Sequence, residues 1–398
     1  MKIKEITVEK LFDTFDHTIS LKTEEGITLM LGENGFGKTV LLEMINALFN
    51  QNFYYFQSVV FKRFQLKFED NLVWEVIKSD NEITLRLFDN NELKESVFVY
   101  NSDKVLPEWF MERVSLLNIR LVDTQRLLVI AESLPTTFQA IEHTNRLKTD
   151  VEKETQKMSQ ATTILAYANE LAENIKSHFA KSMELATKLD STYPSRLAKN
   201  RHQYDNISAE HLKAELQELD KKRQLFHAVG LLEQEENTAF LDDEHTDKFM
   251  IPVLMVYIDD SKLKLQIFEN LAQKLKCFLG IINNRFLYKT MSVDKQQGFI
   301  FTSTMTGKQI PTTGLSSGEQ HELVLFYELL FKTQDNALIL IDEPEISLHI
   351  SWLNQFIEDL KKVIEQGRMD ILIATHSPDI IGNHWDLTVE LKGIKQID

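Results

Sequence analysis

The segment that decides the fold is residues 26–39, which read Gly-Ile-Thr-Leu-Met-Leu-Gly-Glu-Asn-Gly-Phe-Gly-Lys-Thr. Its first six residues form a compact apolar run, as expected for a buried strand. The last eight match the pattern G-x-x-x-x-G-K-S/T, and residues 39–49 continue with apolar positions on one helical face. A strand, a glycine-rich turn and a helix in this order predict a phosphate-binding loop, or P-loop.

The chemistry of this loop depends on backbone donors. Its glycines let successive N–H groups wrap around an anion at the start of a helix, where the helix dipole favours negative charge. Lys38 would neutralise the β- and γ-phosphates of a nucleotide, and Thr39 would ligate Mg²⁺. The candidate nucleotide-binding residues of the loop are Gly32, Asn34, Gly35, Phe36, Gly37, Lys38 and Thr39.

Two acidic residues follow a second apolar run. Residues 338–341 are Leu-Ile-Leu-Ile and lead directly into Asp342 and Glu343. A carboxylate pair at the end of a buried strand is costly unless it has a chemical role. Asp342 fits a ligand that holds the metal through water. Glu343 fits the general base that orients or deprotonates an attacking water.

Two further polar residues belong to the candidate set. Gln125 lies in the segment 121–127 and is a candidate ligand for the metal and the water. His376 follows the apolar run 371–374, where a neutral imidazole would donate a hydrogen bond to the γ-phosphate. The candidate catalytic residues are therefore Glu343, His376 and Gln125, and the candidate metal ligands are Thr39, Gln125 and Asp342.

The composition is that of a globular protein. The chain has 398 residues, of which 43% are hydrophobic and 26% charged. No apolar run approaches the ~20 residues of a membrane helix, and the N-terminus lacks the apolar core of a secretion signal. The single cysteine, Cys277, excludes an internal disulfide and a multi-cysteine zinc site. These features predict a cytoplasmic protein that has no membrane partner.

The net charge of −16 disfavours binding to nucleic acid, because a uniformly acidic surface repels phosphate. Contact with DNA would need a local basic patch. The basic residues that could form one are Arg196, Lys199, Arg201, His202, Lys221, Lys222 and Arg223. The alternative interpretation of these residues is a solvated helix face.

The spacing of apolar residues divides the chain into three parts. Short alternating runs between residues 59 and 100, separated by Asp-Asn and Asn-Asn turns, predict an antiparallel meander. Residues 151–189 contain no glycine or proline and repeat apolar positions at steps of three and four. Pro194 breaks that pattern, and a second run reaches Gly230, so we expect two antiparallel helices that form a coiled-coil-like arm. Residues 253–282 predict a third, more apolar helical region.

The segment 315–320, Leu-Ser-Ser-Gly-Glu-Gln, resembles the signature motif of ABC-type ATPases, in the version typical of the SMC and DNA-repair branch. Residues 342–349 and 375–378 resemble the ATPase domains of OLD-family nucleases and of related ATPases in anti-phage systems such as Septu, Gabija, PARIS and some retrons. The resemblance implies an α/β fold, namely an ABC-type P-loop ATPase head with a mixed sheet, an antiparallel β subdomain and an inserted helical arm. We expect 1–130 and 285–398 to form the two halves of the head and 131–284 to form the insertion.

The resemblance also implies cofactors and partners. The cofactors would be ATP and Mg²⁺, and two heads would enclose two ATP molecules in a homodimer or a higher homo-oligomer. Ser316 and Gly318 of one copy would bind the γ-phosphate held by the P-loop of the other. The loop 345–349 would communicate across that interface. Two departures from the family pattern, Phe36 and Ser317, leave these phosphate ligands in place but could slow turnover.

Four functions remain open from the sequence. The first is an ATP-driven sensor or scaffold that controls a separately encoded effector, such as a nuclease, in phage defence. We expect the effector on another chain because few residues follow His376. The second is an SMC-like DNA-repair ATPase. The third is the nucleotide-binding subunit of a transporter, which the large insertion disfavours. The fourth is an ATP-gated binding module that barely hydrolyses ATP.

Overall fold

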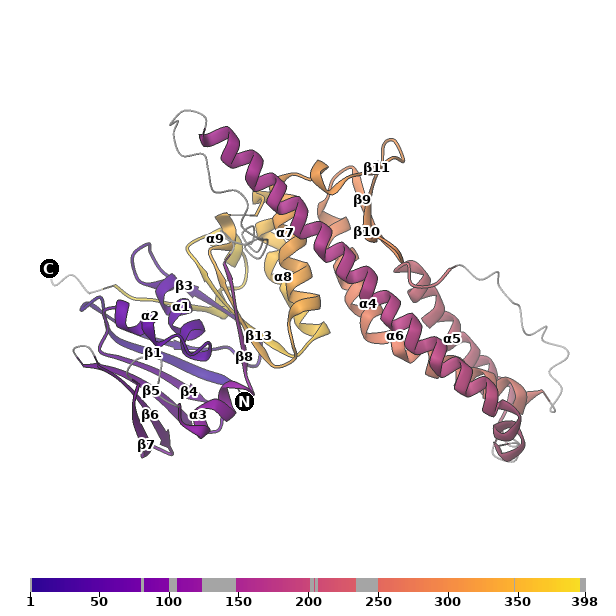
Figure 1. Cartoon of the computed structure of the whole chain (residues 1–398), viewed down its shortest axis with the longest axis horizontal. Coiled ribbons are helices and arrows are strands. Elements are labelled where there is room, and N and C mark those ends of the chain that lie inside the picture. The colour runs from indigo at the N-terminus through magenta and orange to yellow at the C-terminus, as the bar shows by residue number, and fades with distance from the viewer. Residues whose placement is uncertain are drawn as a thin grey trace, which may run out of the picture. The chain divides into compact units, whose positions relative to one another are not determined.

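The computed structural model describes residues 2–79, 82–99, 106–123, 148–200, 204, 207–233, 250–346 and 348–393 (Figure 1). The chain divides into two compact units. The first, here called the sheet unit, contains Met1–Pro135 and His321–Asp398. The second, here called the helical unit, contains Thr136–Gln320. Within the described ranges, no helix is long and apolar enough to cross a membrane.

A five-stranded parallel sheet forms one layer of the sheet unit. Its strands lie in the order β14-β3-β13-β12-β8, and every pairing between neighbours is parallel. The central strands are almost wholly apolar, as expected when both faces of a parallel sheet are covered. The bounds are β3 Ile27–Leu31, β8 Asn118–Asp123, β12 Ala337–Asp342, β13 Met369–Thr375 and β14 Thr388–Glu390.

A six-stranded antiparallel sheet forms a second layer. Its order is β2-β1-β4-β5-β6-β7, so its last four strands are the meander predicted from the alternating runs. Asn71, Asn90 and Asn91 turn the chain between these strands with positive φ, which asparagine tolerates well. The bounds are β1 Ile3–Leu11, β2 Phe15–Ser20, β4 Arg63–Phe68, β5 Leu72–Ser79, β6 Glu82–Asp89 and β7 Glu92–Val99.

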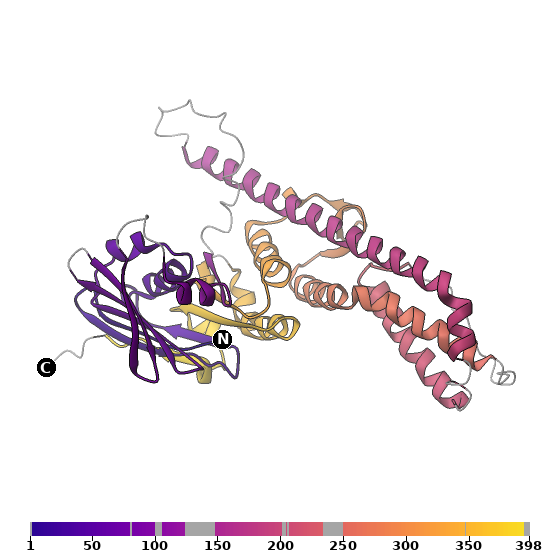
Figure 2. The same ribbon diagram turned by 60° about the horizontal axis from the view of Figure 1, so that its bottom comes forward.

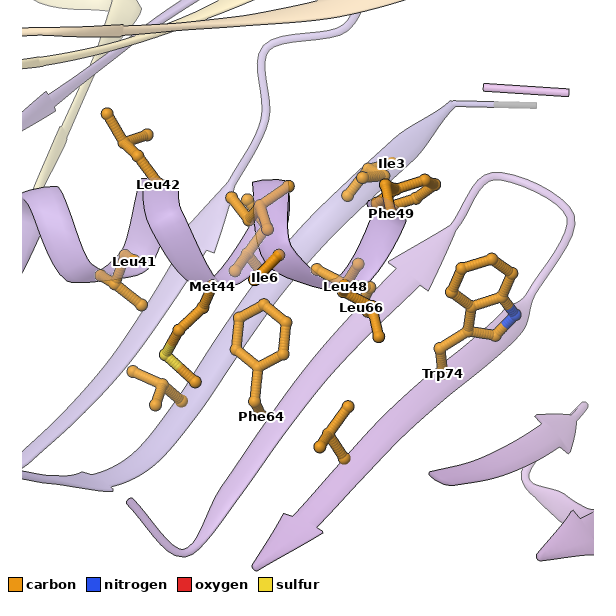
Figure 3. Close-up of a cluster of buried hydrophobic side chains, with 14 of the residues drawn as sticks. Ile3, Ile6, Leu41, Leu42, Met44, Leu48, Phe49, Phe64, Leu66 and Trp74 are labelled. Atoms are coloured by element: carbon orange, nitrogen blue, oxygen red, sulfur yellow. The ribbon is translucent and has the colours of Figure 1, made fainter. Parts of the chain in front are cut away.

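The helix after the P-loop, α1 (Lys38–Phe49), packs against both sheets. Figure 3 shows Leu41, Met44 and Leu48 of α1 beside Phe64 and Leu66 of β4. Because α1 is apolar toward both layers, the apolar core fixes the position of the P-loop at its first turn. The remaining elements of the unit are α2 Phe53–Ser58, α3 Glu108–Val114, η3 Glu328–Lys332, η4 Pro344–Ile346, α8 Ile350–Gln366, α9 Pro378–Ile381 and η5 Trp385–Leu387, and α7 (Ser317–Tyr327) leads into it.

The helical unit is built around one long helix, α6 (Ile251–Arg285), against which α4 (Lys148–Asn200) and α5 (Ala209–Ala228) both pack (Figure 2). Phe268 of α6 lies 4.9 Å from Phe179 of α4 and 6.3 Å from Phe226 of α5, measured between ring centroids. The sequence predicted that the first two helices pair with each other, whereas the structure gives each of them α6 as its main partner. The more apolar sequence of α6 explains this arrangement, because its buried residues recur along the whole helix and can cover two neighbours.

Pro194 does not end α4, contrary to the prediction that it breaks the helical pattern. Proline removes one backbone donor from a helix interior. Side chains also donate to carbonyls of the turn before it. Arg196 donates to the oxygen of Leu189 at 2.8 Å, and Thr192 donates to the oxygen of Lys188 at 3.0 Å. Pro194 removes the donor for the oxygen of Asp190, four positions earlier, so these bonds stabilise the turn without replacing the missing one.

A small antiparallel sheet completes the helical unit. It contains β9 (Lys289–Asp294), β10 (Gly298–Ser303) and β11 (Gln309–Ile310), and the turn η2 (Thr312–Gly314) follows. The sheet packs on α4 through Gly298, whose φ is +78° and whose added Cβ would lie 1.8 Å from the backbone oxygen of Ala168. Residues 285–320 therefore belong to the same compact unit as the helices, whereas the sequence interpretation placed them with the C-terminal half of the head.

Candidate functional site

Parallel pairing brings the ends of four strands to one edge of the five-stranded sheet. Asp342, the last residue of β12, pairs with Ala374 of β13 and Asp123 of β8. Thr375, the last residue of β13, pairs with Leu31, the last of β3. Because these strands run in the same direction, the residues after each of them emerge at the same edge. The P-loop, the acidic pair and the candidate histidine therefore share that edge.

Lys38 begins α1 and folds its side chain back over the P-loop. Its Nζ donates to the backbone oxygens of Gly32, at 2.8 Å, and Glu33, at 3.2 Å. Gly37, the residue before it, has a φ of +84°, and a Cβ there would lie 2.4 Å from the Leu11 side chain. Glycine is required at that position for both reasons. The loop therefore holds the ammonium group beside its own backbone, where it attracts an anion.

One aromatic ring and a histidine of β2 support the loop. The Nε2 of His17, which is only 3% exposed, lies 3.0 Å from the backbone oxygen of Phe36. Burial lowers the pKa of His17, so the ring is neutral and donates through Nε2–H. Phe15 stacks on His17 and lies 5.4 Å from Phe36, measured between ring centroids. The bulky residue at position 36 thus packs against the protein rather than lining an open loop.

The chain turns sharply after β12. Glu343 has a φ of +42°, which is unusual for a residue other than glycine, and its backbone N–H donates to the oxygen of Ala374 at 2.9 Å. Strained backbone of this kind occurs often at functional sites. Asp342 and Glu343 are both half-buried, and the Glu343 side chain is 20% exposed. Solvent can therefore reach the Glu343 carboxylate, while the backbone of Glu343 is fixed by its hydrogen bond to β13.

A third carboxylate, Glu345, joins the acidic segment to β13. Its Oε1 accepts hydrogen bonds from the Thr375 hydroxyl at 2.8 Å and from the His376 backbone N–H at 3.0 Å. The Nδ1 of His376 lies 3.1 Å from the same oxygen and 3.6 Å from Oε1 of Glu343. Sequence reasoning placed Glu345 in a loop that communicates between subunits and missed these contacts, because nothing in the local pattern indicates them.

The signature residues belong to the helical unit and form a helix cap. The Oγ of Ser316 accepts from the N–H of Glu319 at 3.3 Å, and the Glu319 side chain accepts from the N–H of Ser316 at 2.7 Å. This reciprocal pair is a capping box at the start of α7. Lys289 of β9 holds the Glu319 carboxylate at 2.6 and 2.9 Å. Ser316 remains exposed, and Gly318 lies in the first turn of the helix.

Not every candidate residue can be placed. Gln125 lies outside the described residues, although Asp123, two positions earlier, ends β8 directly beside Asp342. Ser316 and Gly318 lie in the helical unit, and the other candidates lie in the sheet unit. The residues that the sheet edge brings together are thus the P-loop set with Thr39, the acidic pair Asp342 and Glu343, and His376.

The residues at this edge fit a nucleotide and Mg²⁺. Space is open where a side chain at Gly35 would lie, and Thr39 is exposed at the first turn of α1. Among the described residues, no group of three or more His, Cys, Asp or Glu side chains could hold a metal. Proteins bind Mg²⁺ through one or two carboxylates together with substrate phosphates. Thr39 and Asp342 would hold Mg²⁺, which would neutralise phosphate charge.

Comparison with known proteins identifies a family. The family described as "AAA ATPase domain" matches residues 1–381. Among curated proteins, UvrABC system protein A of Clostridium perfringens is 32% identical over 71 residues, which cover 18% of this chain and 8% of that protein. The same protein of Clostridium acetobutylicum is 26% identical over 145 residues, which cover 36% and 13%. The chain therefore matches only a small part of the length of these relatives.

Two solved structures of SMC heads are similar in outline. The Smc head domain of Pyrococcus furiosus with an extended coiled coil, bound to the C-terminal domain of ScpA, has a TM-score of 0.41 and 12% identity, and the match covers 96% of this chain and 91% of that one. An SmcHead bound to the C-winged helix domain of ScpA has a TM-score of 0.39 and 10% identity, with 96% and 92% covered. At TM-scores below 0.5, these likenesses carry no argument about function.

Proposed function

The chain belongs to the AAA ATPase domain family, and we propose that it is a Mg²⁺-dependent ATP hydrolase that assembles with a second copy of itself around ATP. We further propose that this assembly controls a separately encoded effector, such as a nuclease, in defence against phage. ATP hydrolysis is the general activity of the family. The finer proposal rests on the residues of the candidate site and on the resemblance of its motifs.

The observation that carries the ATPase proposal is the strand register at the sheet edge. It sets Asp342 level with Ala374 and Thr375 level with Leu31, so that the P-loop, the acidic pair and His376 follow three neighbouring strands. In the proposed roles, Lys38 binds the β- and γ-phosphates, Glu343 orients or deprotonates the attacking water, and Asp342 holds the metal. Positioning and charge stabilisation account for most of the catalysis of phosphoryl transfer.

The proposal of a second copy comes from the signature turn. Ser316 is exposed, and its hydroxyl and the first turn of α7 are held in place by Glu319 and Lys289. An exposed helix start that is held by these contacts suits an anion. We propose that the anion is the γ-phosphate of ATP bound to the other copy. In that case hydrolysis depends on protein concentration, because a monomer lacks half of each site.

The main alternative is a DNA-binding ATPase, and the charges of the helical unit weigh against it. Arg196 pairs with Asp260 at 2.5 and 2.7 Å, and Lys222 pairs with Glu269 at 3.4 Å. The guanidinium of Arg223 donates to the hydroxyl of Tyr257 at 2.8 Å. These cations are engaged within the unit, so they offer less charge to phosphate. Of the other candidates for a basic patch, Arg201 and His202 lie outside the described residues.

The test combines hydrolysis with partner capture. Phosphate release should rise faster than linearly with protein concentration at saturating Mg-ATP, and linear dependence down to nanomolar protein would contradict the proposed assembly. Purification of the chain together with the product of a neighbouring gene should yield a complex if the effector proposal is right. Tight ATP-dependent DNA binding that weakens with salt would favour the DNA-repair alternative instead, and a co-purified membrane permease would favour transport.

A further inference from the structure

The side chain of Glu345 contacts residues of the candidate site that lie outside its own turn. Its side chain is 8% exposed, although glutamate is seldom buried without a partner. All three of its short polar contacts go to Thr375 and His376, which follow one another at the end of β13. Its second oxygen, Oε2, is buried and accepts no hydrogen bond from the described residues. The carboxylate is therefore directed at the segment that carries His376.

From this arrangement we infer that Glu345 is a positioning residue, which holds the backbone of His376 at the sheet edge and fixes the proton of its ring on Nδ1. The inference deepens the proposed ATPase function and rests on it. Two donors, the Thr375 hydroxyl and the His376 N–H, fix the carboxylate first. The ring then meets an oxygen whose position is already determined.

The proton assignment follows from electrostatics. Nδ1 of His376 lies 3.1 Å from Oε1 of Glu345 and 3.6 Å from Oε1 of Glu343. A carboxylate oxygen can only accept a hydrogen, so a lone pair on Nδ1 would face two negative groups and be repelled. A proton on Nδ1 removes that repulsion. The neutral ring then presents a lone pair at Nε2.

This arrangement changes what His376 can do at the site. The sequence suggested a neutral imidazole that donates to the γ-phosphate. With Nδ1 protonated, the neutral ring can only accept through Nε2, for example from the attacking water. It can donate to a phosphate oxygen only when both nitrogens carry protons. Glu345 therefore makes Nε2 of the neutral ring an acceptor.

The chain offers two informative substitutions. Glu345→Gln keeps an oxygen that can accept from Thr375 and from the backbone of His376, whereas Glu345→Ala removes it. We expect Glu345→Ala to lower kcat for ATP by up to about 100-fold, because a misplaced group at a reacting centre costs this much, and to leave ATP binding unchanged. Glu345→Gln should recover much of kcat. Equal loss in both variants would overturn the role of the oxygen.

A double-mutant cycle tests whether Glu345 acts through His376. The double variant Glu345→Ala, His376→Ala should have the kcat of His376→Ala alone, since nothing is left to position. Independent, multiplying losses would overturn the inference. A matched control is Glu358→Ala, since Glu358 of α8 contacts His384 at 3.0 Å in a similar carboxylate–histidine pair away from the strand ends. This variant should leave kcat unchanged.

A measurement on the unmodified chain does not depend on how any variant folds. Nitrogen-15 NMR of the histidine rings, with the His376 signal assigned by its loss in His376→Ala, distinguishes the two neutral tautomers. We expect the Nδ1–H form, and the Nε2–H form would overturn the inference. An unmodified chain that binds no ATP and releases no phosphate would overturn the proposed function, whereas normal turnover by Glu345→Ala would overturn only the role of Glu345.

Discussion

The sheet edge and the signature turn carry motifs of one candidate site, yet they are built in different ways. At the sheet edge, residues more than three hundred positions apart meet because parallel strands end level with one another, as Leu31 and Thr375 do. At the signature turn, Ser316 and Glu319 are three positions apart and cap their own helix. The first region depends on the long-range fold, and the second depends on local hydrogen bonds and on Lys289.

This difference predicts how each region fails. A change at the sheet edge alters nucleotide contacts while the buried strands keep the fold. A change in the helical unit away from the signature turn alters stability while the nucleotide contacts remain. Four substitutions test the comparison, beginning with the largest expected effect.

Lys38→Ala should abolish nucleotide binding, because it removes the ammonium group that the P-loop would place beside the phosphates. Equilibrium titration with a fluorescent ATP analogue measures the effect. Lys22→Ala is the matched control, since Lys22 is exposed and precedes β3, at the end opposite the P-loop. Normal affinity in Lys38→Ala, or equal loss in both variants, would contradict the role of the loop.

Glu343→Gln should retain ATP binding and lose turnover, because an amide cannot accept the proton of the attacking water. The ATP-bound assembly should then accumulate, which size-exclusion chromatography with light scattering can detect. Glu365→Gln, at an exposed position of α8, should behave as the unmodified chain does. Hydrolysis at the normal rate in Glu343→Gln would exclude this residue as the general base.

Gly298→Ala should destabilise the helical unit by more than the roughly 1–2 kcal/mol that left-handed backbone costs an alanine. The added Cβ would lie 1.8 Å from the backbone oxygen of Ala168, so α4 and β10 must move apart. Gly307→Ala separates the cost of left-handed backbone from the cost of the close contact. Gly307 has a φ of +67° but open space around it. Thermal unfolding compares the two variants, and equal losses of stability would show that the close approach does not matter.

Arg196→Ala should have the smallest effect on ATP handling, and it should lower stability because the buried Asp260 loses its cation. ATP affinity should not change. Denaturant unfolding of Arg196→Ala and of the exposed Lys181→Ala on the same helix provides the comparison. A weakened ATP affinity in Arg196→Ala would contradict the expectation that this part of the helical unit has no role in nucleotide binding.

The sequence predicted those parts of the fold that have a local signal. The apolar run before the P-loop, the alternating meander and the acidic pair after residues 338–341 each carry a recognisable pattern, and the structure has β3, β4–β7 and β12 at those places. The periodicity does not indicate that α4 continues through Pro194, because proline ordinarily interrupts a helix. The partner of α4 and α5 is a matter of long-range packing, for which spacing alone gives no answer.

The candidate site shows the same division. The strand-end residues could be named from the sequence because each follows an apolar run. Glu345 and His17 could not be named in this way. Each matters because of a contact that forms only when the chain is folded. Glu345 meets His376 across two strand ends, and His17 reaches Phe36 from a strand that precedes the P-loop.

The most direct test of the central proposal mixes two inactive variants. Lys38→Ala lacks the phosphate-binding ammonium, and Ser316→Arg blocks the signature turn, so neither should hydrolyse ATP alone. If the site combines the sheet edge of one copy with the Ser316 turn of another, a mixed dimer has one intact site, and phosphate release should appear on mixing. Mixtures that stay as inactive as their components, although the two variants associate, would contradict a site shared between copies.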